Sequence, residues 1–327
     1  MAVTIKDVAE RAGVSVGTVS MALNNNEKVN HETSKKIHEI ASELNYIPNT
    51  VAKALTKKKT GVVALVIPTV DNHFYSEMIQ AIKNVLKKCD YNLILCTMNW
   101  NTEEEIRYLN MFKSGVVDGV IFACYNGNNE NIIEFAKNYK PVVYIDKAID
   151  NNNLIPHVKA DLKKAAYKAT NYLIELGHTD VGYILHEEER IQGFKEAMED
   201  NGCAMNEEFL YSNRNMFFDR VKNNKKLPSA IVCFNDYVAF RVMLFLSRAG
   251  LKVPEDISIC GIDNVSMAKM YDPPLTTVDV PIDKIALRGV KLLIELINGE
   301  KLKAEDYLIE YNPDLIIRES SCEFRSS

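Results

Sequence analysis

The chain has 327 residues, of which 47% are hydrophobic and 25% are charged, and its formal net charge is -5 at pH 7. This length suits two or three domains, and the composition is ordinary for a soluble globular protein. No run approaches the roughly 18 consecutive apolar residues of a membrane span, and residues 1–10 lack the apolar core of a signal peptide. We therefore expect a cytoplasmic protein.

The charge is unevenly distributed along the chain. Residues 1–60 contain nine Lys and Arg against six Asp and Glu, whereas residues 61–327 contain 30 against 38. A basic head on an acidic body suggests that only the head approaches a polyanion. A surplus of this size is also common on an ordinary solvated surface.

Cysteine and histidine usage argues against a disulfide framework and against a metal site. The seven cysteines are widely spaced, without a Cys-x-x-Cys pair, and most lie in apolar runs, as free thiols do in a reducing compartment. The six histidines are scattered, with none at the i, i+4 spacing of a helical metal pair. We expect no metal and no cofactor.

The first elements expected are two short helices joined by a tight turn. Thr4 can cap the first helix, and Gly13 suits a turn with positive φ. Ser15 can cap the second helix, which carries Val19 and Leu23 on its inner face. This spacing predicts a helix-turn-helix, whose second helix lies in the DNA major groove.

A third helix is expected over about residues 32–44, and Pro48 prevents its continuation. The segment 49–59 that follows is short, basic and helix-favourable. A helix of this length is marginal on its own. Two interpretations therefore remain open: a solvated flexible linker, or a hinge that folds only against DNA with its lysines near phosphates.

Three stretches carry a family resemblance: VTIKDVAERAGVSVGTVS at residues 3–20, ALN at 22–24 and LNYIPNTVAKAL at 44–55. They resemble the headpiece of the lactose-repressor (LacI/GalR) family over nearly all of residues 3–60. The resemblance implies a homodimer on a pseudo-palindromic operator. It also implies a hinge helix in the minor groove that wedges Leu55 into the central base step, as apolar side chains of this kind do when they kink a duplex.

The resemblance also assigns the expected DNA contacts. Base reading falls on the start of the recognition helix, at Val16, Gly17 and Met21. The positions that match phosphate contacts, which set register without reading sequence, are Thr4, Ser15, Thr18, Ser20, Asn24, Thr33, Tyr46 and Asn49.

Met21 departs from the family pattern, because most members carry arginine there. Arginine can read guanine with two hydrogen bonds, whereas methionine offers only apolar contact, for example to a thymine methyl. We therefore expect an operator half-site that differs from the usual one. The alternative is that Met21 is a tolerated surface residue that reads nothing.

From residue 61 onward, strand and helix signals alternate. Strands are expected over about residues 62–67, 91–95, 119–122, 141–145, 181–185, 230–234 and 257–261, with short strands near Leu308 and Leu315; helices are expected over about 74–89, 102–112, 131–138, 162–176, 191–200, 238–249 and 282–297. Thr102 and Glu105 have the spacing of a capping box. Apolar strands alternating with helices indicate parallel sheets covered on both faces, and two such series indicate two Rossmann-like lobes.

The second series contains motifs similar to the periplasmic-binding-protein-like core of the LacI/GalR family. They are Gly177-His178, Arg190-x-x-Gly-Phe194, Asn235-Asp236, Gly261-x-Asp263 and Pro273-Pro-Leu-Thr-Thr277. The domains expected are a headpiece at 1–47, a hinge helix and linker at 48–60, and an effector-binding and dimerisation core at 61–327. Within the core, lobe 1 is expected at about 61–158 and 283–311, and lobe 2 at about 159–282 and 312–327.

Ligands of open α/β sheets bind beyond the carboxyl ends of the strands. Carboxylates, an amide, a guanidinium and aromatic rings at these ends suit a polyhydroxylated ligand. The effector-binding residues expected are Asn72, Phe74, Asp146, Arg190, Phe218, Asn235 and Asp263. By resemblance, Asp146, Arg190, Asn235 and Asp263 match positions that hold effector hydroxyls, and Phe74 and Phe218 would form walls.

Each assignment has a plainer alternative. Asp236 or Asp263 could cap a helix, and Asp146 could be only a loop residue. Arg190 follows three glutamates and could form a surface ion pair, which contributes little stability. A partner protein could also replace the small molecule and leave the cleft without a ligand.

Other classes of function fit less well. A solute-binding protein for a transporter shares the core fold but has no use for a DNA headpiece. No catalytic motif is present, so an enzyme would rest on fold analogy alone. We expect a repressor, controlled by a sugar or sugar derivative, that dimerises through the helix at 238–249 and the region around Tyr271. We expect no tetramer, because the short tail after Arg318 shows no leucine heptads.

Overall fold

The computed structural model describes residues 3–24, 26–47, 59–123, 130–146, 154–185 and 188–324. The chain forms two compact units, Met1–Thr60 and Gly61–Ser327. Among the described residues, no helix combines the length and the apolar character needed to span a bilayer.

Unit 1 is a three-helix domain with helices α1 (Ile5–Ala12), α2 (Val16–Leu23) and α3 (His31–Glu43). Its core is built from Val8, Ala9, Ala12, Val19, Ala22, Ile37, Ile40 and Ala41. The turn between α1 and α2 forms as expected, since Gly13 has φ 70° and the Ser15 hydroxyl accepts the Thr18 N–H at 3.0 Å. At the start of α1, the backbone N–H and hydroxyl of Thr4 both donate to the Asp7 carboxylate, at 2.7 and 2.8 Å.

The expected hinge lies outside the described residues, and so do Asn49 and Leu55. Their assignments therefore stay predictions.

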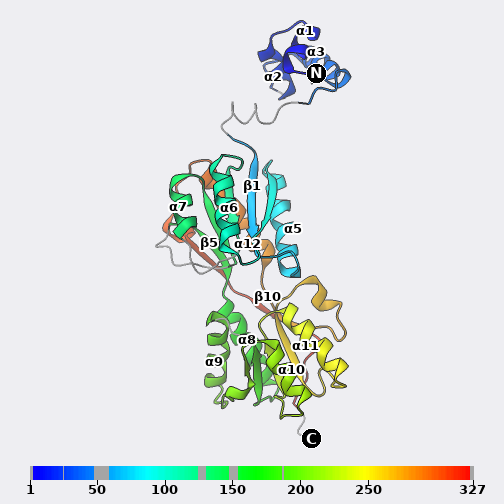
Figure 1. The fold of residues 1–327 in the computed structure, drawn as a ribbon, viewed down its shortest axis with the longest axis vertical. Coiled ribbons are helices and arrows are strands. Elements are labelled where there is room, and N and C mark those ends of the chain that lie inside the picture. Colours follow the sequence, from blue (N-terminus) through cyan, green and yellow to red (C-terminus); the bar gives the residue numbers. More distant parts are fainter. Residues whose placement is uncertain are drawn as a thin grey trace. The chain divides into compact units, whose positions relative to one another are not determined.

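Lobe 1 of unit 2 is a parallel six-stranded sheet in the order β11-β5-β4-β3-β1-β2. Its strands are β1 (Val62–Ile67), β2 (Asn92–Thr97), β3 (Gly119–Phe122), β4 (Val142–Ile145), β5 (His157–Ala160) and β11 (Leu308–Tyr311). Helices α5 (His73–Lys88) and α12 (Ile282–Ile297) pack together against one face, and α6 (Thr102–Lys113) and α7 (Glu130–Asn138) cover the other (Figure 1). Alternate residues of β1 face the two helix layers, which explains its continuous apolar sequence.

Lobe 2 is a second six-stranded sheet in the order β12-β10-β9-β8-β6-β7, parallel except for β12. Its strands are β6 (Val181–Ile184), β7 (Leu210–Tyr211), β8 (Ala230–Cys233), β9 (Ser258–Asp263), β10 (Thr276–Asp279) and β12 (Asp314–Ile316). Its helices are α8 (Leu162–Glu175), α9 (Glu188–Asp200), α10 (Arg214–Lys222) and α11 (Asp236–Arg248), and short 3-10 helices lie at Glu207–Phe209 and Ser266–Lys269. Helices α8 and α9 pack so closely that a Cβ at Gly193 would lie 1.9 Å from the Lys163 carbonyl oxygen.

The chain passes between the two lobes three times (Figure 1). It leaves lobe 1 after β5, returns from β10 to α12, and leaves again from β11 to β12. Three separate chain segments therefore join the two lobes.

One local expectation is wrong. Helix α6 is capped by Asn101, whose side chain accepts the Glu103 N–H at 2.8 Å, so Thr102 and Glu105 form no capping box. Glu105 is instead buried, and burial raises the pKa of its carboxyl to about 7.

Candidate functional site

A cavity of about 480 Å³ lies between the lobes, where the carboxyl ends of several strands meet. Lobe 1 contributes Thr69, Asp71, Asn72, Phe74, Tyr75, Trp100 and Asp146, and lobe 2 contributes Leu185, Arg190, Arg214, Phe234, Asn235, Tyr237, Val238 and Asp263. We call this cavity the inter-lobe cleft. A volume of this size accommodates a small molecule.

Six of the seven residues expected to bind an effector line the inter-lobe cleft: Asn72, Phe74, Asp146, Arg190, Asn235 and Asp263. Phe218 is not among the lining residues. Its ring, on α10, stacks on the ring of Phe245 on α11, with centroids 4.0 Å apart. The predicted wall at Phe218 is therefore replaced by packing between two helices.

Arg190 is held within the wall of the cleft. Its side chain is buried, its Nη1 donates to the Phe234 carbonyl at 2.5 Å, and its guanidinium carbon lies 4.1 Å from the centre of the Phe234 ring. The alternative of an exposed surface ion pair is wrong, because Arg190 is only 5% exposed. A guanidinium fixed in this way keeps a defined orientation for a ligand.

Asn235 and Asp236 follow β8, and their side chains make different hydrogen bonds. The Asn235 side-chain oxygen accepts the Val238 N–H at 3.0 Å and so caps α11. Its amide nitrogen is left as the donor group that a ligand could use.

Asp236 is fully buried and accepts the Val265 N–H at 3.0 Å and the Thr277 hydroxyl at 2.5 Å. Burial raises the pKa of its carboxyl, against the effect of these hydrogen bonds. A Cβ at Gly261 would lie 2.3 Å from an Asp236 oxygen, so only glycine leaves room there. Asp236 therefore connects α11 to β9 and β10. The sequence left open whether Asp236 caps a helix, but the residue that caps α11 is Asn235.

Asp146 and Asp263 stand at the ends of β4 and β9 with left-handed backbone angles, φ 78° and 125°. Both are buried, and the Asp146 N–H donates to the Val158 carbonyl at 3.0 Å. Such angles cost about 1–3 kcal/mol in residues with a side chain, and they cluster at functional sites. The turn at each strand end thus brings a carboxylate into the wall of the cleft.

The structure adds cleft residues that the sequence analysis missed, among them Trp100 and Arg214. Trp100 follows β2 and is 53% exposed, and its φ of 58° belongs to a turn that no local pattern predicted. Arg214 is the first residue of α10, a position where the helix dipole disfavours a cation. Its guanidinium makes no hydrogen bond or ion pair with any residue that the structure describes.

On unit 1, the residues expected to read bases share one exposed face of α2. Val16 and Met21 are 40% and 37% exposed, and Gly17 is exposed as well. The opposite face of α2 buries Val19 and Ala22 in the core. The amphipathic pattern therefore leaves the first turn of α2 open to a partner.

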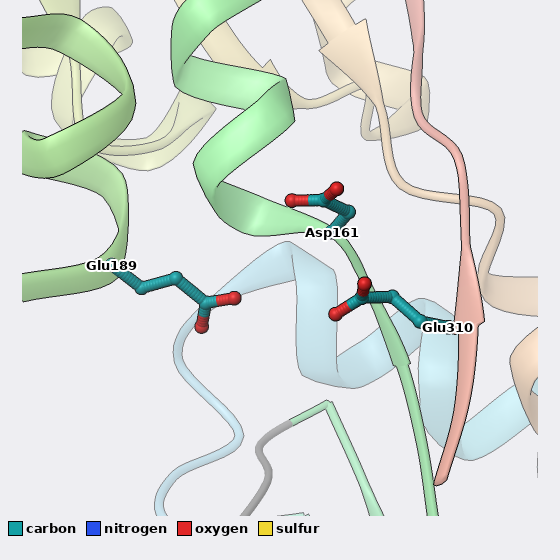
Figure 2. A group of neighbouring side chains, drawn as sticks. All are labelled: Asp161, Glu189 and Glu310. Atoms are coloured by element: carbon teal, nitrogen blue, oxygen red, sulfur yellow. The ribbon is translucent and has the colours of Figure 1, made fainter. Parts of the chain in front are cut away.

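A cluster of three carboxylates lies near the first crossing between the lobes. Figure 2 shows Asp161, Glu189 and Glu310 directed toward a common space from three different elements, and their oxygens lie within 4.8 Å of one another. The Lys159 ammonium group is bonded to two of them, at 2.5 Å from Glu189 Oε1 and 3.2 Å from Glu310 Oε1. A lysine therefore supplies the positive charge of this cluster, and we assign no metal site.

Comparisons with known proteins place the chain in a family. The family described as "Bacterial regulatory proteins, lacI family" matches residues 4–49, and the "Periplasmic binding protein-like domain" matches residues 170–321. The chain is also 32% identical to the HTH-type transcriptional regulator RegA of Clostridium saccharobutylicum, over 98% of this chain and 100% of that protein. The chain belongs to the LacI family of bacterial regulatory proteins. The family resemblance predicted from residues 3–60 is confirmed.

Two solved structures show the same LacI-type fold. One is the lac repressor dimer bound to operator and the anti-inducer ONPF, with a TM-score of 0.84 and 23% identity over 98% of this chain and 100% of that one. The other is a LacI family transcriptional regulator from Enterococcus faecium with bound ribose, with a TM-score of 0.72 and 25% identity over 81% of this chain and 100% of that one. The predicted architecture, a helix-turn-helix headpiece and a two-lobed α/β core, is confirmed, and the chain is a DNA-binding transcription regulator.

Proposed function

We propose that this LacI-family regulator is a repressor whose operator affinity is controlled by a sugar or sugar derivative in the inter-lobe cleft. The observation that carries the proposal is the composition of the cleft. Carboxylates, a fixed guanidinium, an amide and aromatic rings converge from both lobes on about 480 Å³.

The proposed ligand contacts follow from the chemistry of these groups. Asp146 and Asp263 would accept hydrogen bonds from hydroxyls, and Arg190 and the Asn235 amide would donate. The faces of Phe74 and Trp100 would cover the apolar C–H side of a sugar ring. The LacI family regulator from Enterococcus faecium was solved with bound ribose, which supports a sugar as the ligand class.

On the DNA, we infer that α2 enters the major groove and that Val16, Gly17 and Met21 meet the base edges. Because Met21 can offer only apolar contact, a thymine methyl is the base feature it suits. Phosphates would be met by Thr4, Ser15, Thr18, Ser20, Asn24, Thr33, Tyr46 and Asn49. Leu55 would be the wedge of a hinge helix at the operator centre.

We infer that the working unit is a homodimer, because a pseudo-palindromic operator mirrors a two-fold axis in the protein. The exposed apolar side chains of Leu244 on α11 and Met270 before Tyr271, 45% and 70% exposed, support the predicted contact surface. Tyr271 joins these two regions, since its hydroxyl donates to the Phe240 carbonyl at 2.9 Å and the two rings stack.

Control would come from movement of the lobes. A ligand that binds both walls of the cleft favours one lobe orientation, and the orientation sets the spacing of the two hinges in the dimer. The coupling must be reciprocal: a ligand that weakens operator binding must itself bind less tightly when operator is present.

The test is a thermal-unfolding screen of the full chain against monosaccharides, disaccharides, sugar acids, sugar phosphates and nucleosides. At about 100 times its dissociation constant a ligand should add about 2.7 kcal/mol of stability. A selective response to one sugar, which then changes affinity for an operator selected from random DNA, supports the proposal. A flat response contradicts the sugar and favours a protein co-regulator.

A further inference from the structure

The first crossing between the lobes contains a buried lysine. Lys159 lies on β5, directly beside Glu310 of β11 in the register of the lobe 1 sheet. Its side chain is 9% exposed, and its ammonium group lies 3.2 Å from Glu310 Oε1. This pair joins two strands of the same sheet, so it persists whatever the orientation of lobe 2.

The same ammonium group also reaches lobe 2. It donates to Glu189 Oε1 at 2.5 Å, and Glu189 belongs to the first turn of α9. Figure 2 shows the Glu189 carboxylate extending from its helix toward Glu310 and Asp161. The Lys159–Glu189 pair therefore spans the two lobes, whereas the Lys159–Glu310 pair does not.

The charges at this place favour a permanent cation. Burial alone lowers the pKa of Lys159, but hydrogen bonds and charges from Glu189 and Glu310 outweigh it and raise that pKa. The third carboxylate, Asp161, caps α8 by accepting the Lys164 N–H at 2.8 Å. The Lys159 ammonium thus pairs with two of the three carboxylates, and it loses one of these partners, Glu189, when α9 moves away.

Glu189 immediately precedes Arg190, whose guanidinium lines the inter-lobe cleft. We propose that the Lys159–Glu189 ion pair is an inter-lobe link that anchors the first turn of α9 to β5 and so positions Arg190 in the cleft. Lys159 is then a positioning residue. A change in lobe orientation alters its pair with Glu189, and this in turn alters the position of Arg190 in the wall of the cleft. The role of Arg190 toward a ligand rests on the proposed function, but the link itself does not.

The chain offers a matched set of variants. Glu189→Gln and Glu310→Gln each remove one charge beside the same lysine, and these side chains are similarly exposed, at 37% and 40%. Glu188→Gln removes a charge from the same first turn of α9 and controls for the helix dipole. Lys159→Arg keeps the cation at the crossing.

The experiment is native-state hydrogen–deuterium exchange of the full chain without any ligand. In Glu189→Gln, amides in residues 192–196 should exchange about three- to tenfold faster, the factor expected when a hydrogen bond between charged groups is weakened. Glu310→Gln, Glu188→Gln and Lys159→Arg should leave these amides within about twofold of the parent chain. The urea midpoint of global unfolding should stay unchanged throughout.

The inference is overturned if Glu189→Gln leaves these amides unchanged, or if any of the three control variants accelerates their exchange equally. Should Glu189→Gln lower global stability, Glu189→Asp, which keeps the charge but shortens its reach, must give the same local acceleration. Because the exchange experiment uses no ligand, its result is independent of the ligand screen. A screen in which no ligand stabilises the chain would contradict the proposed function but not this inference.

Discussion

Arg190 combines burial, a hydrogen bond to the Phe234 carbonyl and stacking on the Phe234 ring. Because these contacts hold the guanidinium before any ligand arrives, little side-chain entropy is lost on binding. This preorganisation makes Arg190 the residue at which the proposed site is most easily tested.

We expect Arg190→Met to raise the dissociation constant of the sugar found in the screen by about 10- to 100-fold, because hydrogen bonds from a charged donor are lost. Calorimetric titration checks this. Arg220→Met is the control, since Arg220 is paired with Glu208 outside the cleft. Equal affinities in the parent chain and Arg190→Met would mean that the cleft has been assigned to the wrong residues.

His178 is a second residue with a measurable consequence. It is buried, with Nε2 3.0 Å from the Cys322 carbonyl and Nδ1 3.0 Å from the Ser229 hydroxyl, and burial lowers its pKa. A lowered pKa means that the unfolded state takes up the proton more readily. Stability from this group is therefore present above the unfolded value of about 6.5 and is lost as pH falls through it.

We expect the urea midpoint of the parent chain to fall more between pH 7.5 and pH 5.5 than that of His178→Gln, which has no imidazole to protonate. Urea unfolding at the two pH values provides the comparison. Identical falls in the two proteins would show that His178 does not contribute to the acid sensitivity.

At the scale of elements, the same residues of helix α2 affect both the stability of unit 1 and its proposed recognition of DNA bases. Gly17 lies inside α2, where glycine costs about 0.5–1 kcal/mol relative to alanine. A Cβ there would meet only the Ser15 hydroxyl oxygen at 3.6 Å, an ordinary contact. Nothing in the described part of unit 1 therefore requires glycine at this position.

Gly17→Ala should stabilise an isolated 1–60 segment by about 0.5–1 kcal/mol, which thermal unfolding followed by circular dichroism can measure. If Gly17 faces the bases as proposed, the same variant should weaken binding of the full chain to its operator. A more stable segment with unchanged operator affinity would remove Gly17 from the recognition surface.

The elements also show what the sequence could predict. The Gly13 turn, the Ser15 cap and the apolar strands are local signals, and the structure contains them. Strand β7 has only two residues, too few for a periodic pattern. Trp100 and Arg214 reach the cleft because of turns and strand order, which no short window of sequence determines. Phe218 was misplaced for the same reason, because its partner Phe245 is distant in sequence.

At the scale of the molecule, the proposed dimer surface can be tested by charge. Leu244 and Met270 are exposed near the Phe240–Tyr271 stack, and a buried unpaired carboxylate opposes association. Leu244→Asp combined with Met270→Asp should shift the chain toward monomer, which sedimentation velocity measures. The same double variant should bind its operator more weakly. Met205→Asp, at another exposed apolar side chain, should sediment like the parent chain. An unchanged dimer in the double variant would place the interface elsewhere.

Both lobes are assembled from separated pieces of chain, and this sets the order in which they can fold during synthesis. Lobe 1 needs β11 and lobe 2 needs β12, which are neighbours in sequence at Leu308–Tyr311 and Asp314–Ile316. Ser320 then completes lobe 2, since its hydroxyl donates to the Ile259 carbonyl at 2.7 Å and accepts the Thr276 N–H at 2.8 Å. Unit 1, by contrast, builds its core entirely within the first sixty residues. On the ribosome, unit 1 can thus fold first, while both sheets of unit 2 are completed only when their last strands emerge, almost together.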